Sequence, residues 1–169
     1  MRRLPQRSRR LTLNLSHVRE DSLIALYRRF TSLDRPDRRL LLEAASLMAL
    51  VWTGLRLLRF PTLRRVLDRY AGSPATRNRG PRSSDPVRWA VAAVAARCPS
   101  ATCLVQALAA DAILRRRGLT SELRIGVRVR GNCDVPFEAH AWVECGGAVV
   151  TGAIEDLADF EVLTTLRPQ

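Results

Sequence analysis

Residues 98–118 read CPSATCLVQALAADAILRRRG, and this stretch decides the fold. Residues that favour the start of a helix come first, namely Pro99, Ser100 and Thr102. The run Leu104–Leu114 is almost wholly apolar, and three arginines precede Gly118. Because capping residues, an apolar run and a following glycine mark a helix with its two ends, the stretch predicts a buried helix with Cys103 in its first turn.

The expected position of Cys103 at the start of a helix affects the ionisation of its thiol. At the start of a helix, the positive end of the macrodipole and unpaired backbone N–H groups stabilise a thiolate over a thiol. Enzymes with a cysteine nucleophile place the reactive sulfur in this way. The alternative is that Cys103 is a small buried apolar residue, since free cysteine is among the most buried residue types.

The second informative stretch is FEAHAWVECGGAVVTG, residues 137–152. It predicts a strand over 137–145, a two-residue turn at Gly146-Gly147, and a returning strand over 148–151. Strand alternation assigns side chains to two faces. One face has His140, Trp142 and Glu144; the other has Ala139, Ala141, Val143 and Cys145.

A cysteine at a helix start followed by a histidine on a strand is the papain-type arrangement. The imidazole of His140 would hold Cys103 as a thiolate and later protonate a leaving amine, as nucleophilic acyl transfer requires. A structural histidine beside Trp142 is the alternative. A zinc site from Cys98, Cys103, Cys133 and His140 lacks a CxxC pair and is disfavoured; we expect no metal and no cofactor.

Composition limits the class of protein. The chain has 169 residues, 47% of them hydrophobic and 26% charged, as in a globular protein with one core. Its formal charge is +12, with no lysine, which suggests an acidic partner. The arginines are spread along the chain and aromatic residues are only 5%, so we expect no nucleic-acid partner. The four cysteines have irregular spacings and we see no secretion signal, so we expect a cytoplasmic protein.

The rest of the chain predicts a helical region over residues 1–71, a linker over 72–84 and a core over 85–169. Within these we expect helices at 16–33, 38–58 and 85–97, a break at Phe60-Pro61, and strands at 123–130 and 160–163. The uninterrupted apolar stretch between Glu43 and Arg56 has twelve residues, fewer than the roughly twenty that span a bilayer. We expect a buried or interfacial helix, and peripheral contact with an anionic membrane stays open.

Arginines alternate with apolar residues in the strand expected at 123–130. Arg124, Arg128 and Arg130 share one face. We expect this face to be solvated rather than to bind a ligand.

Four pieces, CLVQALAADAILRRRG, LRIGVRV, FEAHAWVE and GAVVTG, in this order and spacing, resemble the leader peptidase of lasso peptide biosynthesis. That family is a transglutaminase-like cysteine protease, the protease half of the B protein. The likeness covers about residues 85–163. It implies a papain-like α+β fold, with a nucleophile helix packed on an antiparallel sheet and a helical N-terminal region before it.

The resemblance places the family's cysteine on Cys103 and its histidine on His140. The family's third residue is an aspartate on the strand after the histidine. Counting back from the turn pairs Cys145 with Ala148 and therefore His140 with Ala153, which has no acid. Glu155 or Asp156 could substitute, or a Cys-His pair could work with a weaker orienting group. Glu144 shares the face of His140 but lies four residues away, roughly 13 Å along the strand.

The resemblance implies hydrolysis of the bond between the leader and core segments of a ribosomally made precursor peptide. The expected partners are that leader peptide, a separate leader-recognition protein and an ATP-dependent lasso cyclase. Two other interpretations stay open. One is a catalytically inactive transglutaminase-like module that binds a peptide or partner; the other is an arginine-rich adaptor for nucleic acid or a membrane surface.

Overall fold

The computed structural model describes residues 28, 30–72, 83–129 and 137–166. From Arg39 onward the described residues form one compact α+β unit. Its elements are α2 (Arg35–Leu57), α3 (Phe60–Ala71), α4 (Asp85–Ala95), α5 (Cys103–Arg116), β1 (Ser121–Val129), β2 (Phe137–Cys145), β3 (Ala148–Thr151), a 3-10 turn η2 (Leu157–Asp159) and β4 (Glu161–Leu166). Most of the helix expected at 16–33, most of the 72–84 linker, Arg130 and Cys133 lie outside the described residues.

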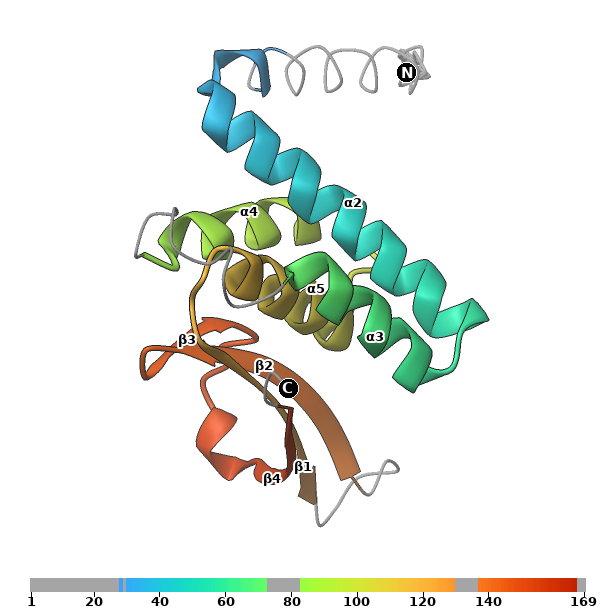
Figure 1. Cartoon of the computed structure of the whole chain (residues 1–169). Helices are drawn as coiled ribbons and strands as arrows, with labels where there is room; N and C mark the ends of the chain where they lie inside the picture. The colour runs from blue at the N-terminus through green and yellow to red at the C-terminus, as the bar shows by residue number, and fades with distance from the viewer. Residues whose placement is uncertain (1–27, 29, 73–82, 130–136, 167–169) are drawn as a thin grey trace, which may run out of the picture. The chain divides into compact units, whose positions relative to one another are not determined.

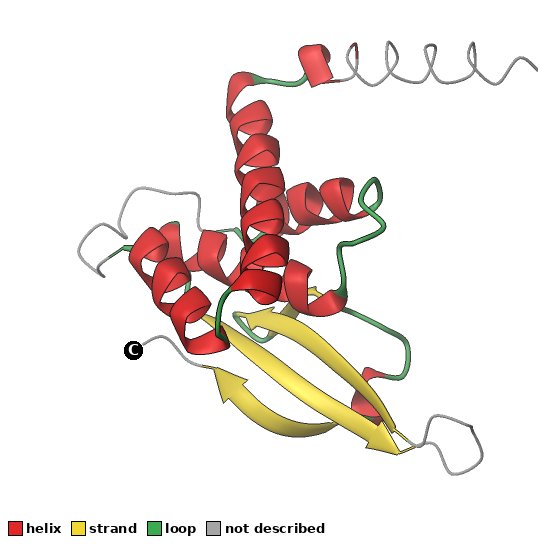
Figure 2. Cartoon of the chain, turned by 90° about the vertical axis from the view of Figure 1, so that its right-hand side faces the viewer, coloured by secondary structure: helices red, strands yellow, loops and turns green. Residues whose placement is uncertain are grey.

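The four strands form one antiparallel sheet in the order β3-β2-β1-β4. The helices cover one face of this sheet, and α5 lies directly against it (Figures 1 and 2). The predicted bounds of β2 and β3 are confirmed, and the last strand begins one residue later than predicted and runs to Leu166. The α+β architecture expected for the chain is therefore present.

The hairpin that joins β2 and β3 agrees only in part with the pairing predicted from the sequence. Gly146 and Gly147 have φ of 59° and 80°, as a tight hairpin turn requires. The pairing Cys145↔Ala148 is confirmed, but a bulge follows, and Val143 pairs with Thr151. The predicted pairing of His140 with Ala153 is wrong, because the bulge shifts the register by one residue and β3 ends at Thr151.

The hydrophobic core lies between the helices and the sheet. Leu108, Ile113 and Leu114 of α5 are buried in it, and Ala141 and Val143 of β2 face them. Helices α2 and α3 share this core rather than forming one of their own. By length and composition alone α2 could cross a membrane, yet six of its residues are buried in the protein: Leu40, Ala44, Leu47, Met48, Val51 and Gly54.

A buried carboxylate lies inside this apolar layer. The side chain of Asp111, in the middle of α5, has no exposed surface. It accepts hydrogen bonds from Arg64 of α3 at 3.0 Å and from the Ser121 hydroxyl at 2.7 Å, and it is 3.1 Å from Arg115. Asp68 of α3 completes the network, 2.7 Å from Arg115. The network joins α3, α5 and the first residue of β1.

The arginines of β1 form ion pairs, on a face that is only partly solvated. Arg124 pairs with Glu122 and Glu144, and Arg128 pairs with Glu138, Asp156 and Asp159. The side chain of Arg128 is only 12% exposed. The alternation in β1 therefore forms a layer of ion pairs on the face of the sheet away from the helices.

Replacing Asp111 by Asn should destabilise the protein strongly. The change removes the fully buried counter-ion of Arg64 and Arg115 and leaves both guanidinium groups with the partly exposed Asp68, which costs about 3–5 kcal/mol of the free energy of unfolding. Asp159→Asn is the matched control, because Asp159 also pairs with an arginine but is 65% exposed, and should change stability by no more than about 0.5 kcal/mol. Urea unfolding of both variants measures the difference, and equal losses would refute the structural role given to Asp111.

Candidate active site

Cys103 is the first residue of α5. The preceding Thr102 has an extended backbone, and its side chain makes no capping hydrogen bond. Two hydrogen bonds hold the segment that precedes the helix. The Ala101 N–H donates to the Cys98 carbonyl at 2.9 Å, and Gln106 Nε2 donates to the Ala101 carbonyl at 2.7 Å. The first-turn N–H groups, left uncapped by a side chain, can bind negative charge beside the half-buried thiol.

His140 lies on β2 opposite Gly126 of β1. Its Nε2 atom is 2.8 Å from the carbonyl oxygen of Gly152, just after β3. A carbonyl only accepts, so Nε2 carries the proton and donates. In the neutral ring the lone pair is then on Nδ1, which is left as the basic atom.

Two aromatic side chains surround the imidazole. The Trp142 ring is stacked at a centroid distance of 6.3 Å, and the Phe160 ring is tilted at 5.6 Å. Both side chains are buried yet are not part of the core cluster that includes Ala141 and Val143. The predicted alternation of β2 is thus confirmed, and it places His140 on the face of the sheet away from α5.

Cys103 and His140 are expected to react together, but the described residues show no hydrogen bond between their side chains. Cys103 packs against the core on the helix side of the sheet. No hydrogen bond between its sulfur and His140 occurs among the described side chains, and the ring of His140 is hydrogen bonded to Gly152. The catalytic pairing of Cys103 with His140 therefore stays a prediction.

The acids expected near His140 have other surroundings. Asp156 is hydrogen bonded and ion-paired to Arg128, whose guanidinium also stacks over Phe160. The hydrogen bonds that Arg128 donates to Glu138 and then to Asp156 raise its pKa above the usual range, so its positive charge is permanent. Glu155 is exposed, and Glu144 binds Arg124 and the Trp142 indole N–H. The role of Glu155 or Asp156 in a triad stays a prediction.

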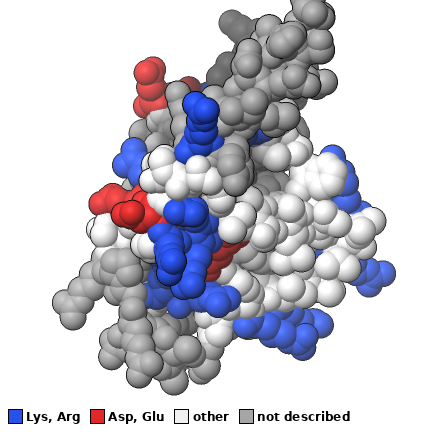
Figure 3. All heavy atoms as spheres, turned by 90° about the horizontal axis from the view of Figure 1, so that it is seen from above, with Lys and Arg blue, Asp and Glu red and all other residues white. Residues whose placement is uncertain are grey.

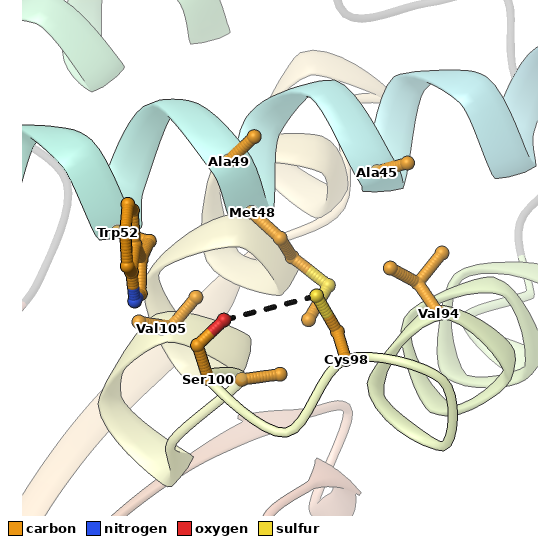
Figure 4. A pocket seen from close by; sticks show the side chains of 9 residues that line it. Ala45, Met48, Ala49, Trp52, Val94, Cys98, Ser100 and Val105 are labelled. Carbon is orange, nitrogen blue, oxygen red and sulfur yellow. Dashed lines mark hydrogen bonds between the residues drawn. The ribbon is translucent and has the colours of Figure 1, made fainter.

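A pocket of about 200 Å³ lies on the helix side (Figure 4). Its lining is mainly apolar: Ala45, Met48, Ala49, Trp52, Val94, Cys98, Ser100, Ala101 and Val105. Ala101 and Val105 flank Cys103 in the sequence, and the Cys98 sulfur is 3.8 Å from the Ser100 hydroxyl. The pocket could therefore hold an apolar side chain of a bound peptide. Two of its lining residues lie within one helical turn of Cys103 in the sequence.

No group of three His, Cys, Asp or Glu side chains among the described residues could hold a metal ion. Cys98, Cys103 and Cys145 are free thiols. Burial raises the pKa of the Cys145 thiol, so this sulfur is a poor nucleophile at neutral pH.

The comparison with protein families agrees with this geometry. Residues 47–165 match the transglutaminase-like superfamily. The chain belongs to this superfamily. The superfamily includes cysteine peptidases, and the match covers α5, the hairpin and the C-terminal part of α2. No curated protein and no solved structure matches the chain.

Sequence reasoning missed the group that binds His140. A main-chain carbonyl has no residue type that could reveal it, and the bulge that brings Gly152 close is not encoded by any strong signal in AVVTG. It also missed Asp111, although an acid inside an apolar helical run was a visible signal. The predicted Cys103 and His140 were placed correctly on their elements, at the start of α5 and on β2.

Gly152→Ala should displace the acceptor of His140. An added Cβ would lie 2.6 Å from the Ala141 carbonyl oxygen, at a φ of +80° that already disfavours a side chain. Gly147→Ala is the matched control, because it has the same φ and nothing within 4 Å of the added Cβ. Nitrogen NMR of the imidazole should show the Nε2–H tautomer in the wild type and Gly147→Ala but not in Gly152→Ala. An unchanged spectrum in all three would contradict the assigned hydrogen bond.

Alkylation should distinguish the cysteines. At pH 7 iodoacetamide should modify exposed Cys98 readily and Cys145 slowly, since a raised pKa leaves little thiolate on Cys145. Raising the pH to 9.5 should increase the rate at Cys145, because more of its thiol then ionises. Peptide mass spectrometry measures both rates. Rapid modification of Cys145 at pH 7 would refute the effect of burial.

Proposed function

We propose that this chain is a cysteine peptidase that removes the leader segment from a lasso peptide precursor, with Cys103 as nucleophile and His140 as general base and acid. One observation carries the proposal: Cys103 is a free thiol at the uncapped start of the helix packed on the sheet that bears His140. Membership of the transglutaminase-like superfamily supports the reaction class. The lasso precursor as substrate rests on the sequence resemblance.

The chemistry assigns one task to each group. His140 Nδ1 takes the proton of the Cys103 thiol, and the sulfur attacks the scissile carbonyl carbon. The first-turn N–H groups of α5 stabilise the resulting oxyanion. The imidazolium then protonates the leaving amine, and water hydrolyses the thioester, which restores the thiol.

The Gly152 carbonyl takes the place of the missing acid in this scheme. It holds the imidazole in the tautomer that leaves Nδ1 free, which is one of the two tasks of a triad carboxylate. Because a neutral carbonyl stabilises the imidazolium less than a carboxylate does, the rate should be lower than with an acid. The proposal requires the imidazole of His140 to come within hydrogen-bond reach of the Cys103 sulfur, a pairing that the described residues do not show.

A catalytically inactive peptide-binding module is the second candidate. The observation in its favour is the position of His140, on the face of the sheet away from Cys103. In either case the partners proposed are the leader peptide, a separate leader-recognition protein and a cyclase, in the cytoplasm.

Cleavage of a precursor peptide tests the proposal. The substrate is the precursor encoded near this gene, supplied together with its leader-recognition protein. The wild type should cut once at the junction of leader and core, and Cys103→Ala and His140→Gln should lose roughly a thousandfold in rate or more, because each removes an essential group. Mass spectrometry of the products measures the rate.

Cys145→Ala is the matched control, because Cys145 is a free cysteine on β2 that lies outside the proposed pair and does not line the pocket. It should retain activity close to that of the wild type. Equal cleavage by Cys103→Ala and the wild type would overturn the assignment of the nucleophile. Leader binding without cleavage in every variant would favour the inactive module.

A further inference from the structure

We propose that the turn between α2 and α3 docks the protein onto an anionic membrane surface. Several large apolar side chains are exposed around this turn. Leu57 is 77% exposed, Leu58 44%, Phe60 38% and Trp52 36%. Leu57, Leu58 and Phe60 fall within four consecutive positions, and we call these three with Trp52 the turn patch.

Positive charge accompanies the turn patch. Arg56, Arg59 and Arg65 are exposed and form no ion pair among the described residues. The Arg56 guanidinium lies 3.6 Å from the centre of the Trp52 ring. On the face seen from above, basic side chains lie around the edge of a wide uncharged area (Figure 3).

No acid in the described part of the chain forms an ion pair with these arginines. The sequence between Glu43 and Asp68 contains no acidic residue. Glu43 itself accepts a hydrogen bond from Tyr70 and lies near Arg116 and Arg117, and Asp68 pairs with Arg115. The charge at the turn is therefore free to act on a partner.

The combination favours a lipid surface over other occupants. A second copy of the chain would bring another cationic patch, and the first ten residues contain five arginines, so both are repelled by the same charge. Apolar side chains beside unpaired arginines match a surface whose headgroups are anionic and whose acyl chains lie just beneath. A bilayer also accepts Leu57, Leu58 and Phe60 without a shaped pocket.

The buried part of α2 makes this contact peripheral. The opposite side of the helix contributes Leu47, Met48 and Val51 to the core, so α2 cannot leave the protein to span the bilayer without loss of that packing. The turn alone would enter the interface, with its arginines at the level of the headgroups.

Vesicle sedimentation of the full chain tests the proposal. We expect binding to phosphatidylcholine vesicles containing 30% phosphatidylglycerol, at least tenfold weaker binding to pure phosphatidylcholine, and weakening in high salt. Leu57→Ser with Leu58→Ser, and separately Arg56→Gln with Arg59→Gln, should each reduce the affinity at least fivefold. Trp52 fluorescence should be quenched by brominated lipid.

Two variants elsewhere control for general effects of charge and apolar surface. Leu163→Ser removes a leucine on β4 whose 63% exposure lies between those of Leu58 and Leu57, and Arg97→Gln removes an exposed arginine after α4; both variants should bind like the wild type. Equal binding by all variants, or no preference for anionic vesicles, would overturn the proposal. If the protein binds polyglutamate but not vesicles, the membrane proposal would be overturned in favour of an acidic protein partner. The assay uses no peptidase substrate, so its outcome is independent of the proposed reaction.

Discussion

The buried carboxylate of Asp111 is the constraint on which the arrangement of the helices and the sheet depends. An unpaired charge in an apolar layer is very costly, so α3 must supply Arg64 and α5 must supply Arg115 at the same point. The Ser121 hydroxyl adds the start of β1 to that point. The rotation of α5 about its axis is thereby set, and with it the position of Cys103 two to three turns earlier.

The sheet contributes a second constraint, which acts on His140. The bulge after Glu144 brings Gly152 beside β2, and its carbonyl fixes the proton of the imidazole on Nε2. Trp142 needs space over β1, and Gly126 provides it, since an added Cβ would lie 3.0 Å from the indole ring. The face away from the helices therefore has a layer of aromatic rings and ion pairs that is only partly exposed to solvent.

Much of this could be predicted from the sequence because it depends on local patterns. The apolar run after Thr102, the alternation around His140 and the Gly146-Gly147 turn each define an element within a few residues. The bulge, the partners of Arg128 and the Gly152 carbonyl depend on contacts between distant segments, which periodicity does not encode. The shared core of α2, α3 and the sheet was hidden for the same reason, because an apolar helix is compatible with several partners.

His140 is proposed to activate the thiol of Cys103, and the alkylation rate of Cys103 at neutral pH tests this activation without any substrate. We compare the wild type with His140→Ala, and use Cys98 in the same molecules as an internal reference. If the imidazole accepts the thiol proton, Cys103 should react roughly tenfold or more faster in the wild type than in His140→Ala. Equal rates at Cys103 in the two proteins would contradict the claim.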